Sequence, residues 1–170
     1  MVLIIMGVVG VGKTTVGRLV AEKLGWQFAD ADDFHPAANV EKIRRGIPLD
    51  DEDRAPWLAS LQKAIVEWNA KNENAVLACS ALKQKYRDRL SADGVRFVYL
   101  EGAPELIRQR LGARRGHFAT DSILASQFRD LEVPEDAIAV PVDKTPGSIA
   151  EEILTKLKRP DLRYPDAAHP

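Results

Sequence analysis

The amino-acid sequence predicts an α/β fold in which a five-stranded parallel sheet is flanked by helices. Two observations predict this fold class. Short apolar runs alternate along the chain with longer segments whose apolar residues recur at helical spacing. A glycine-rich segment also joins the first apolar run directly to the first helical segment, which is the connection expected where a buried strand leads into a helix.

The first strand is predicted over residues 2–6, where every side chain is apolar, as expected of a strand buried on both faces. A helix follows over 13–24 because its apolar residues share one face, and Gly25 is its stop signal. The second strand is predicted over 26–29. The polar stretch over 36–53 contains glycine and proline, which predicts a short helix and a loop.

A helix is predicted over 56–68, opened by its proline and followed by apolar residues on one face. The third strand, over 75–79, is a short apolar run, and a helix is predicted over 80–90. The fourth strand and its helix follow over 96–100 and 104–111.

The last strand is predicted over 139–142, and a closing helix over 148–157 that Ser148 could cap. Residues 1–158 are therefore expected to form a single domain, which suits a chain of 170 residues. The segment 159–170 is rich in proline and lacks apolar periodicity, so we expect a mobile tail.

The glycine-rich segment matches the phosphate-binding motif G-x-x-x-x-G-K-[ST] over residues 7–14. Its glycines let the backbone approach a ligand closely, so that successive N–H groups can surround a phosphate at the positive end of the helix. Lys13 is expected to reach the β- and γ-phosphates, and the Thr14 hydroxyl to ligate Mg²⁺. The motif predicts a P-loop NTPase that binds ATP and Mg²⁺. The expected nucleotide contacts are Gly7, Gly10, Val11, Gly12, Lys13, Thr14 and Thr15.

Composition excludes several classes of protein. Lys and Arg total 24 against 25 Asp and Glu, so there is no basic field that would favour a nucleic-acid partner. No segment reaches the roughly 18 apolar residues of a membrane span. The single cysteine, Cys79, fits a reducing compartment, and the N-terminus lacks a basic leader, so we expect a cytoplasmic enzyme. A homodimer is left open.

Ligands of parallel sheets bind beyond the carboxyl ends of the strands, where Asp30 and Asp32 follow the second strand. Asp32 is the candidate to accept the proton of a substrate hydroxyl. Asp30 and Asp32 could instead both serve Mg²⁺ through water, and Asp30 is the candidate metal residue. A third interpretation is that these carboxylates only form a polar turn and a helix cap.

Basic residues follow the fourth strand in a segment that also contains glycines. Arg110 and Arg114 are spaced for one helix face and suit a lid, over about 110–122, that closes on the triphosphate and stabilises the transferred phosphoryl group. The alternative is an ordinary solvated helix face. This distribution resembles the small-metabolite kinases of the nucleoside-monophosphate-kinase type.

A more specific resemblance covers residues 3 to about 134. It is carried by Asp30-Ala31-Asp32-Asp33-Phe34-His35-Pro36 with Asn39, Lys42, Gly46, Pro48-Leu49, Asp51, Asp53-Arg54 and Trp57-Leu58, by Ala78-Cys79-Ser80-Ala81-Leu82-Lys83 with Tyr86-Arg87-Asp88, by Arg114-Arg115-Gly116-His117-Phe118, and by Ser126-Gln127-Phe128 with Leu131-Glu132. These blocks resemble the gluconate kinase family. The chain departs from that pattern at Ala119-Thr120-Asp121. The resemblance implies transfer of the ATP γ-phosphate to the terminal hydroxyl of D-gluconate, giving 6-phosphogluconate.

A pocket for gluconate needs a cation for the carboxylate and polar groups for the hydroxyls. The candidates are Asp32, His35, Arg54, Lys83, Arg87, His117 and Gln127. Each has a structural alternative: His35 as a loop-fixing hydrogen bonder, and the cations as surface partners of Asp53 or Asp88. Other sugar acids and shikimate remain alternative acceptors. A nucleotide-dependent switch protein is the alternative from another class, although no Asn-Lys-x-Asp run is present to bind guanine.

Overall fold

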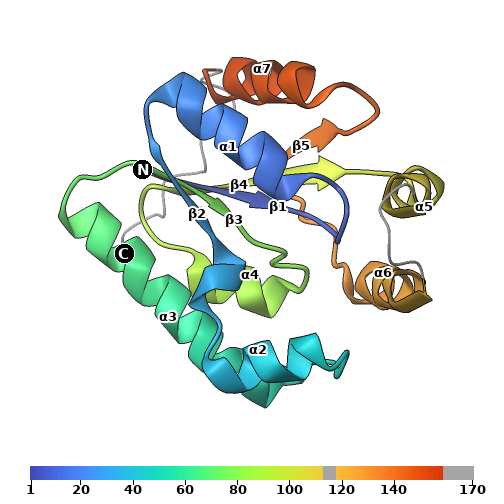
Figure 1. Ribbon diagram of the computed structural model, residues 1–170. Helices are drawn as coiled ribbons and strands as arrows, with labels where there is room; N and C mark the ends of the chain where they lie inside the picture. The colour runs from blue at the N-terminus through green and yellow to red at the C-terminus, as the bar shows by residue number, and fades with distance from the viewer. Residues whose placement is uncertain (113–117, 159–170) are drawn as a thin grey trace.

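The computed structural model describes residues 1–112 and 118–158 of the chain. Its centre is a five-stranded sheet in the order β2-β3-β1-β4-β5, in which every pairing is parallel (Figure 1). The strands are β1 (Val2–Met6), β2 (Gln27–Asp30), β3 (Ala75–Ala78), β4 (Val95–Glu101) and β5 (Ile138–Pro141). The predicted fold class and the five strands are therefore confirmed. Most strand ends differ from the predicted ends by one residue.

Helices cover both faces of the sheet. They are α1 (Lys13–Leu24), the short 3₁₀ helix η1 (Ala31–Phe34), α2 (Ala37–Arg44), α3 (Asp51–Ala70), α4 (Gln84–Leu90), α5 (Pro104–Gly112), α6 (Phe118–Asp130) and α7 (Pro146–Leu157). Helices α1 and α7 lie together on one face, whereas α3 and α4 lie on the other (Figure 1). Helices α5 and α6 stand beyond the ends of β4 and β5 (Figure 1).

Strand β1 lies in the middle of the sheet and is buried on both sides. Leu3 and Ile5 belong to the apolar cluster beneath α1 and α7, whereas Val2, Ile4 and Met6 belong to the cluster on the α3 side. None of the five is measurably exposed, which explains the uninterrupted apolar run. The strand therefore delivers the glycine-rich motif to the centre of one sheet edge.

Helix α3 begins at Asp51, earlier than the predicted start at Pro56, which instead lies inside the helix. The reason is a reciprocal cap. The Asp53 N–H donates to Asp50 Oδ1 at 2.8 Å, and the Asp50 N–H donates to Asp53 Oδ2 at 3.2 Å. The longer helix places Arg54 in its first turn.

Two further expectations about helices were wrong, and one helix was not predicted. Helix α4 begins at Gln84 rather than at residue 80, because the chain turns after β3 through Ala81, whose φ of 42° is left-handed. Helix α7 is capped by Thr145, whose hydroxyl accepts from the Ser148 N–H, so Ser148 is not the cap. Helix α6 was not anticipated.

Within the two described ranges, no helix is both long enough and apolar enough to cross a bilayer. The predicted tail over 159–170 lies outside the described residues. So does the middle of the predicted lid, over 113–117, while its flanks belong to α5 and α6.

Removing the cap of α3 should lower the stability of the fold. We expect Asp50→Ala to reduce the free energy of unfolding by about 0.5–2 kcal/mol, because the Asp53 N–H loses its acceptor. Urea denaturation of the purified variant measures this change. Ser60→Ala, an exposed change on the same helix, is the control and should stay within about 0.5 kcal/mol of the wild type. Equal stability of the Asp50→Ala protein would show that the cap contributes nothing.

Candidate functional site

The phosphate loop connects β1 to α1 as the motif predicts. Gly10 has φ 78°, and a Cβ built on it would lie 2.6 Å from the Leu111 side chain of α5, so a larger residue would collide there. The Lys13 Nζ donates to the Val8 carbonyl at 3.0 Å and so lies over the loop. All seven residues predicted to contact the nucleotide therefore lie in one turn and the helix start that follows it: Gly7, Gly10, Val11, Gly12, Lys13, Thr14 and Thr15.

The electrostatics of Lys13 suit an anionic ligand. Burial lowers the pKa of its amine, and the nearby charges of Asp32 and Asp30 act in the opposite direction. A triphosphate would supply the further negative charge that a partly desolvated ammonium group requires. These electrostatics fit the predicted role of Lys13 in binding phosphate.

Thr14 and Asp30 form the candidate metal site. The Thr14 hydroxyl donates to Asp30 Oδ2 at 2.8 Å, which joins the start of α1 to the end of β2. A hydroxyl and a carboxylate are hard oxygen ligands, and Mg²⁺ typically takes one or two such protein groups together with phosphates and water. Across residues 1–112 and 118–158, no group of three His, Cys, Asp or Glu side chains could hold a metal by itself. The donors present therefore fit Mg²⁺ bound together with a nucleotide.

Asp32 lies on η1, two residues after the metal candidate Asp30. Its N–H donates to Asp30 Oδ1 at 3.2 Å, and Trp57 of α3 fixes the same turn by donating its indole N–H to the Ala31 carbonyl at 2.7 Å. Partial desolvation raises the pKa of the Asp32 carboxyl, the charge of Asp30 raises it further, and Lys13 lowers it. Asp32 is thus a comparatively basic carboxylate close to the phosphate loop.

His35 follows at the end of η1. Its ring stacks on Trp57, with 4.7 Å between the ring centroids and 9° between the planes. Burial lowers the pKa of the imidazole, the charge of Asp32 raises it, and the charge of Arg54 lowers it further. These interactions show that Asp32, His35 and Arg54, all predicted as substrate residues, are neighbours.

Arg54 is held at the junction of α3 and α4. Its Nη1 donates to the Tyr86 hydroxyl at 3.1 Å, and that hydroxyl donates to Asp51, which also accepts from Lys85. The two bonds hold the pKa of Asp51 at about 2. Of the predicted substrate cations Arg54, Lys83 and Arg87, Arg54 is the one whose charge acts on the pKa of His35.

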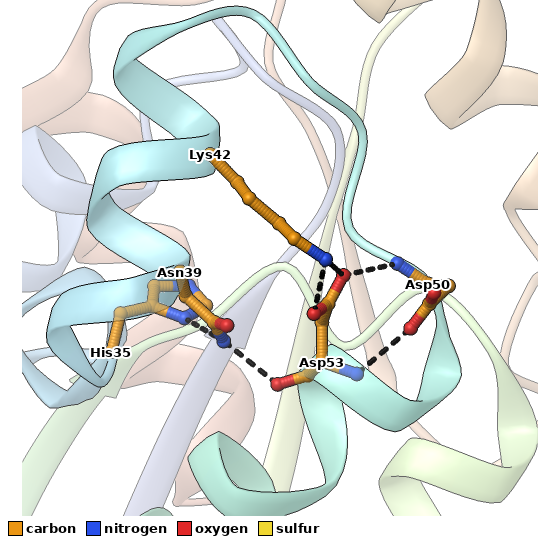
Figure 2. Close-up of polar contacts among 5 residues, drawn as sticks. All are labelled: His35, Asn39, Lys42, Asp50 and Asp53. Carbon is orange, nitrogen blue, oxygen red and sulfur yellow. Dashed lines mark hydrogen bonds and ion pairs between the residues drawn. The ribbon is translucent and has the colours of Figure 1, made fainter.

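Helix α2 is joined to the start of α3 by a polar cluster of His35, Asn39, Lys42, Asp50 and Asp53 (Figure 2). The Lys42 Nζ contacts both Asp53 carboxylate oxygens, at 2.6 and 2.7 Å, and Asn39 donates to the Asp53 carbonyl at 2.7 Å. Asn39 is 3% exposed. The sequence placed Asn39, Trp57 and Tyr86 in the family motifs but gave them no functional role, because residue type alone does not indicate which partner such a side chain meets.

Two of the remaining predicted substrate residues, Arg87 and Lys83, have partners within the protein. Arg87 is buried and donates to the carbonyls of Ala81 and Leu82 at 3.1 and 2.9 Å, and so holds the turn after β3. Its predicted role in substrate binding stays a prediction. The Lys83 Nζ lies 3.8 Å from Asp130, at the end of α6.

Gln127 of α6 meets the phosphate loop. Its Oε1 accepts from the Val9 N–H at 2.6 Å and so contacts the loop backbone, while its predicted role in substrate binding stays a prediction. Of the lid residues, Arg110 donates to the Val142 carbonyl beyond β5. Arg114 and His117 lie outside the described residues, so their predicted roles stay predictions.

Comparison with known proteins gives consistent results. A family model described as Shikimate kinase matches residues 9–158. The gluconokinase of Gluconobacter oxydans (strain 621H) is 43% identical, covering 94% of this chain and 92% of that protein. The crystal structure of a gluconokinase from Sinorhizobium meliloti 1021 matches with a TM-score of 0.82 at 39% identity, covering 91% and 90% of the two chains. Shikimate kinase from Aquifex aeolicus vf5 matches with a TM-score of 0.60 at 17% identity, covering 93% and 96%, a likeness of fold alone.

The contact of Gln127 with the phosphate loop gives a test that separates its two roles. We expect Gln127→Leu to raise the KM for ATP about two- to tenfold, because one hydrogen bond to the loop is lost. The KM for the acceptor should stay unchanged. Steady-state kinetics with each substrate varied in turn measures both constants.

The matched control is Arg129→Gln, an exposed change on the same helix, which should alter neither constant. A rise in the acceptor KM alone for Gln127→Leu would contradict the anchoring role and would support the hydroxyl-binding role expected from the sequence.

Proposed function

Because the chain belongs to the gluconokinase family, within the shikimate kinase-like P-loop kinases, we propose that it transfers the γ-phosphoryl group of ATP to the terminal hydroxyl of D-gluconate and so forms 6-phosphogluconate. The structural observation that carries the proposal is the position of Asp32 beside the phosphate-loop Lys13. Identity of 43% to a gluconokinase, against 17% to a shikimate kinase, favours gluconate over shikimate. The same identity favours a kinase over a nucleotide-dependent switch.

The phosphate loop would bind the triphosphate through its backbone N–H groups and the Lys13 amine. Phosphoryl transfer requires mainly positioning and stabilisation of charge on the transferred group. Little solvent screens the buried Lys13 ammonium, so its charge would both position the transferred phosphoryl group and stabilise the negative charge on it. On binding, Lys13 would exchange the Val8 carbonyl for phosphate oxygens.

Mg²⁺ would be held by Thr14 and Asp30, whose side chains already contact each other at 2.8 Å. The bound ion would neutralise charge on the β- and γ-phosphates. Both Asp30 oxygens are engaged, one by Thr14 and the other by the Asp32 N–H. The contact with Thr14 supports Asp30 as the metal residue and Asp32 as the residue that serves the acceptor.

Asp32 would accept the proton of the attacking hydroxyl. A general base works best when its pKa is raised toward the working pH while it remains ionised, and the environment of Asp32 acts in that direction. The charges of both Lys13 and His35 act on this carboxylate, which supports the proposal that a hydroxyl bound there would face the γ-phosphate.

The acceptor would lie between η1 and the start of α3. Arg54 is our choice for the residue that anchors the carboxylate of gluconate, because a guanidinium can bind a carboxylate with two parallel hydrogen bonds. Tyr86 holds its Nη1 from one side, which leaves the other guanidinium donors for a ligand. His35 would bind a hydroxyl, and Lys83 would contribute positive charge at the far side. Arg110, Arg114 and His117 are proposed as lid residues.

The acceptor preference tests the proposal directly. We expect kcat/KM for D-gluconate to exceed that for D-glucose by about 10²-fold or more, because glucose lacks the carboxylate and leaves Arg54 unpaired. Shikimate should also be a poor acceptor. ADP release measured with each compound, at fixed ATP and Mg²⁺, supplies the comparison.

Arg54→Gln tests the proposed carboxylate anchor. We expect it to raise the KM for gluconate and so to reduce the ratio of kcat/KM for gluconate to kcat/KM for glucose. Faster turnover of glucose or shikimate by the wild-type enzyme would overturn gluconate as the substrate and would leave a kinase of another acceptor.

A further inference from the structure

Asn39 is a buried polar side chain with two neighbours of different kinds. Its Nδ2 atom lies 2.7 Å from the Asp53 carbonyl oxygen and 3.3 Å from His35 Nδ1 (Figure 2). Asn39 is 3% exposed and has little access to water, so its amide must find its hydrogen-bond partners within the protein.

The orientation of the Asn39 amide follows from the Asp53 carbonyl. A carbonyl oxygen can only accept a hydrogen bond, so the amide atom nearest to it must be the NH₂ group. That group carries two hydrogens in fixed directions. One is used by Asp53, and the other is available for the His35 ring.

The state of His35 then follows from its contact with Asn39. An N–H donor facing Nδ1 requires a lone pair on that nitrogen, so Nδ1 carries no proton. Neutral His35 must therefore carry its proton on Nε2. An imidazolium ring would place two N–H groups against each other at this contact.

Two further contacts keep the ring in place. The stacking on Trp57 fixes the ring plane, and Trp57 is itself held by its bond to the Ala31 carbonyl. The ion pair between Lys42 and Asp53 fixes the start of α3 relative to α2, and with it the carbonyl that orients Asn39. The ring cannot turn over without losing the Asn39 bond.

We propose that Asn39 is a positioning residue that holds His35 as the neutral tautomer with its proton on Nε2, so that the acceptor site contains an uncharged hydrogen-bond donor beside Asp32. If gluconate is the acceptor, as proposed above, this donor would bind one of its hydroxyls. The charged groups that act on His35 are Asp32 and Arg54.

The tautomer also determines which ring nitrogen can meet a ligand. With Nδ1 bonded to Asn39, the Nε2–H is the remaining polar group of the ring and can donate one hydrogen bond to the acceptor.

Nitrogen NMR of the enzyme labelled with ¹⁵N-histidine tests this inference without depending on activity. The chain has three histidines, and the spectrum of His35→Gln identifies the signals of His35. At neutral pH we expect an unprotonated Nδ1 and a protonated Nε2. Protonated Nδ1 in the wild-type enzyme would overturn the inference, whichever acceptor is phosphorylated.

Asn39→Asp keeps the size of the side chain nearly constant and replaces the NH₂ donor that faces His35 Nδ1 with a carboxylate oxygen, which can only accept. We expect it to place a proton on Nδ1 of His35 and to raise the KM for gluconate about tenfold through loss of the oriented donor, with the KM for ATP unchanged. An unchanged His35 spectrum in this variant would contradict the role of Asn39. If the variant does not fold, the wild-type spectrum alone decides.

Glu41→Gln is the matched control, because it is an exposed change on the same helix α2 that leaves the contacts of Asn39, Lys42 and Asp53 in place. Its His35 spectrum should equal that of the wild type, and a change of tautomer there would show that Asn39 is not the determinant. The expected spectra together with no turnover of gluconate would reject the proposed function and leave the tautomer assignment standing.

Discussion

The parallel pairing of β1 between β3 and β4 is the constraint on which the rest of the structure depends. Because all strands run in the same direction, their carboxyl ends meet at one edge of the sheet. The phosphate loop leaves β1 there, and Asp30 and Asp32 leave β2 at the same edge. Residues far apart in sequence thereby form one site without any long loop to position them.

Charge is distributed unevenly across that site. Asp30 has both oxygens engaged by Thr14 and by the backbone, whereas Asp32 lies beyond it with a raised pKa. The reciprocal cap of α3 and the contacts of Trp57 and Asn39 fix the elements on which Asp32, His35 and Arg54 lie. Rigid surroundings of this kind hold reacting groups in place before the substrate binds.

The sequence predicted the fold class, the five strands and the phosphate loop, because each depends on local pattern or on a motif with fixed geometry. It missed α6. Among the side chains of this helix that the structure describes, Leu124 is the one that is fully buried, so the apolar spacing that would predict a helix is weak. It also extended α4 back to residue 80, because the turn that Arg87 holds through the Ala81 and Leu82 carbonyls leaves no mark in the apolar pattern. The partner of Gln127 lies in the phosphate loop, 118 residues away, and could not be derived from spacing.

The division of work between the two carboxylates is the central claim, and a comparison of Asp30→Asn with Asp32→Asn tests it most directly. Affinity for the Mg²⁺ complex of a non-hydrolysable ATP analogue is measured by calorimetry, alongside kcat. The account predicts that Asp30→Asn weakens binding of this complex, whereas Asp32→Asn leaves it unchanged and lowers kcat by about 10²-fold or more. Loss of metal–nucleotide binding in Asp32→Asn, with normal binding in Asp30→Asn, would contradict it.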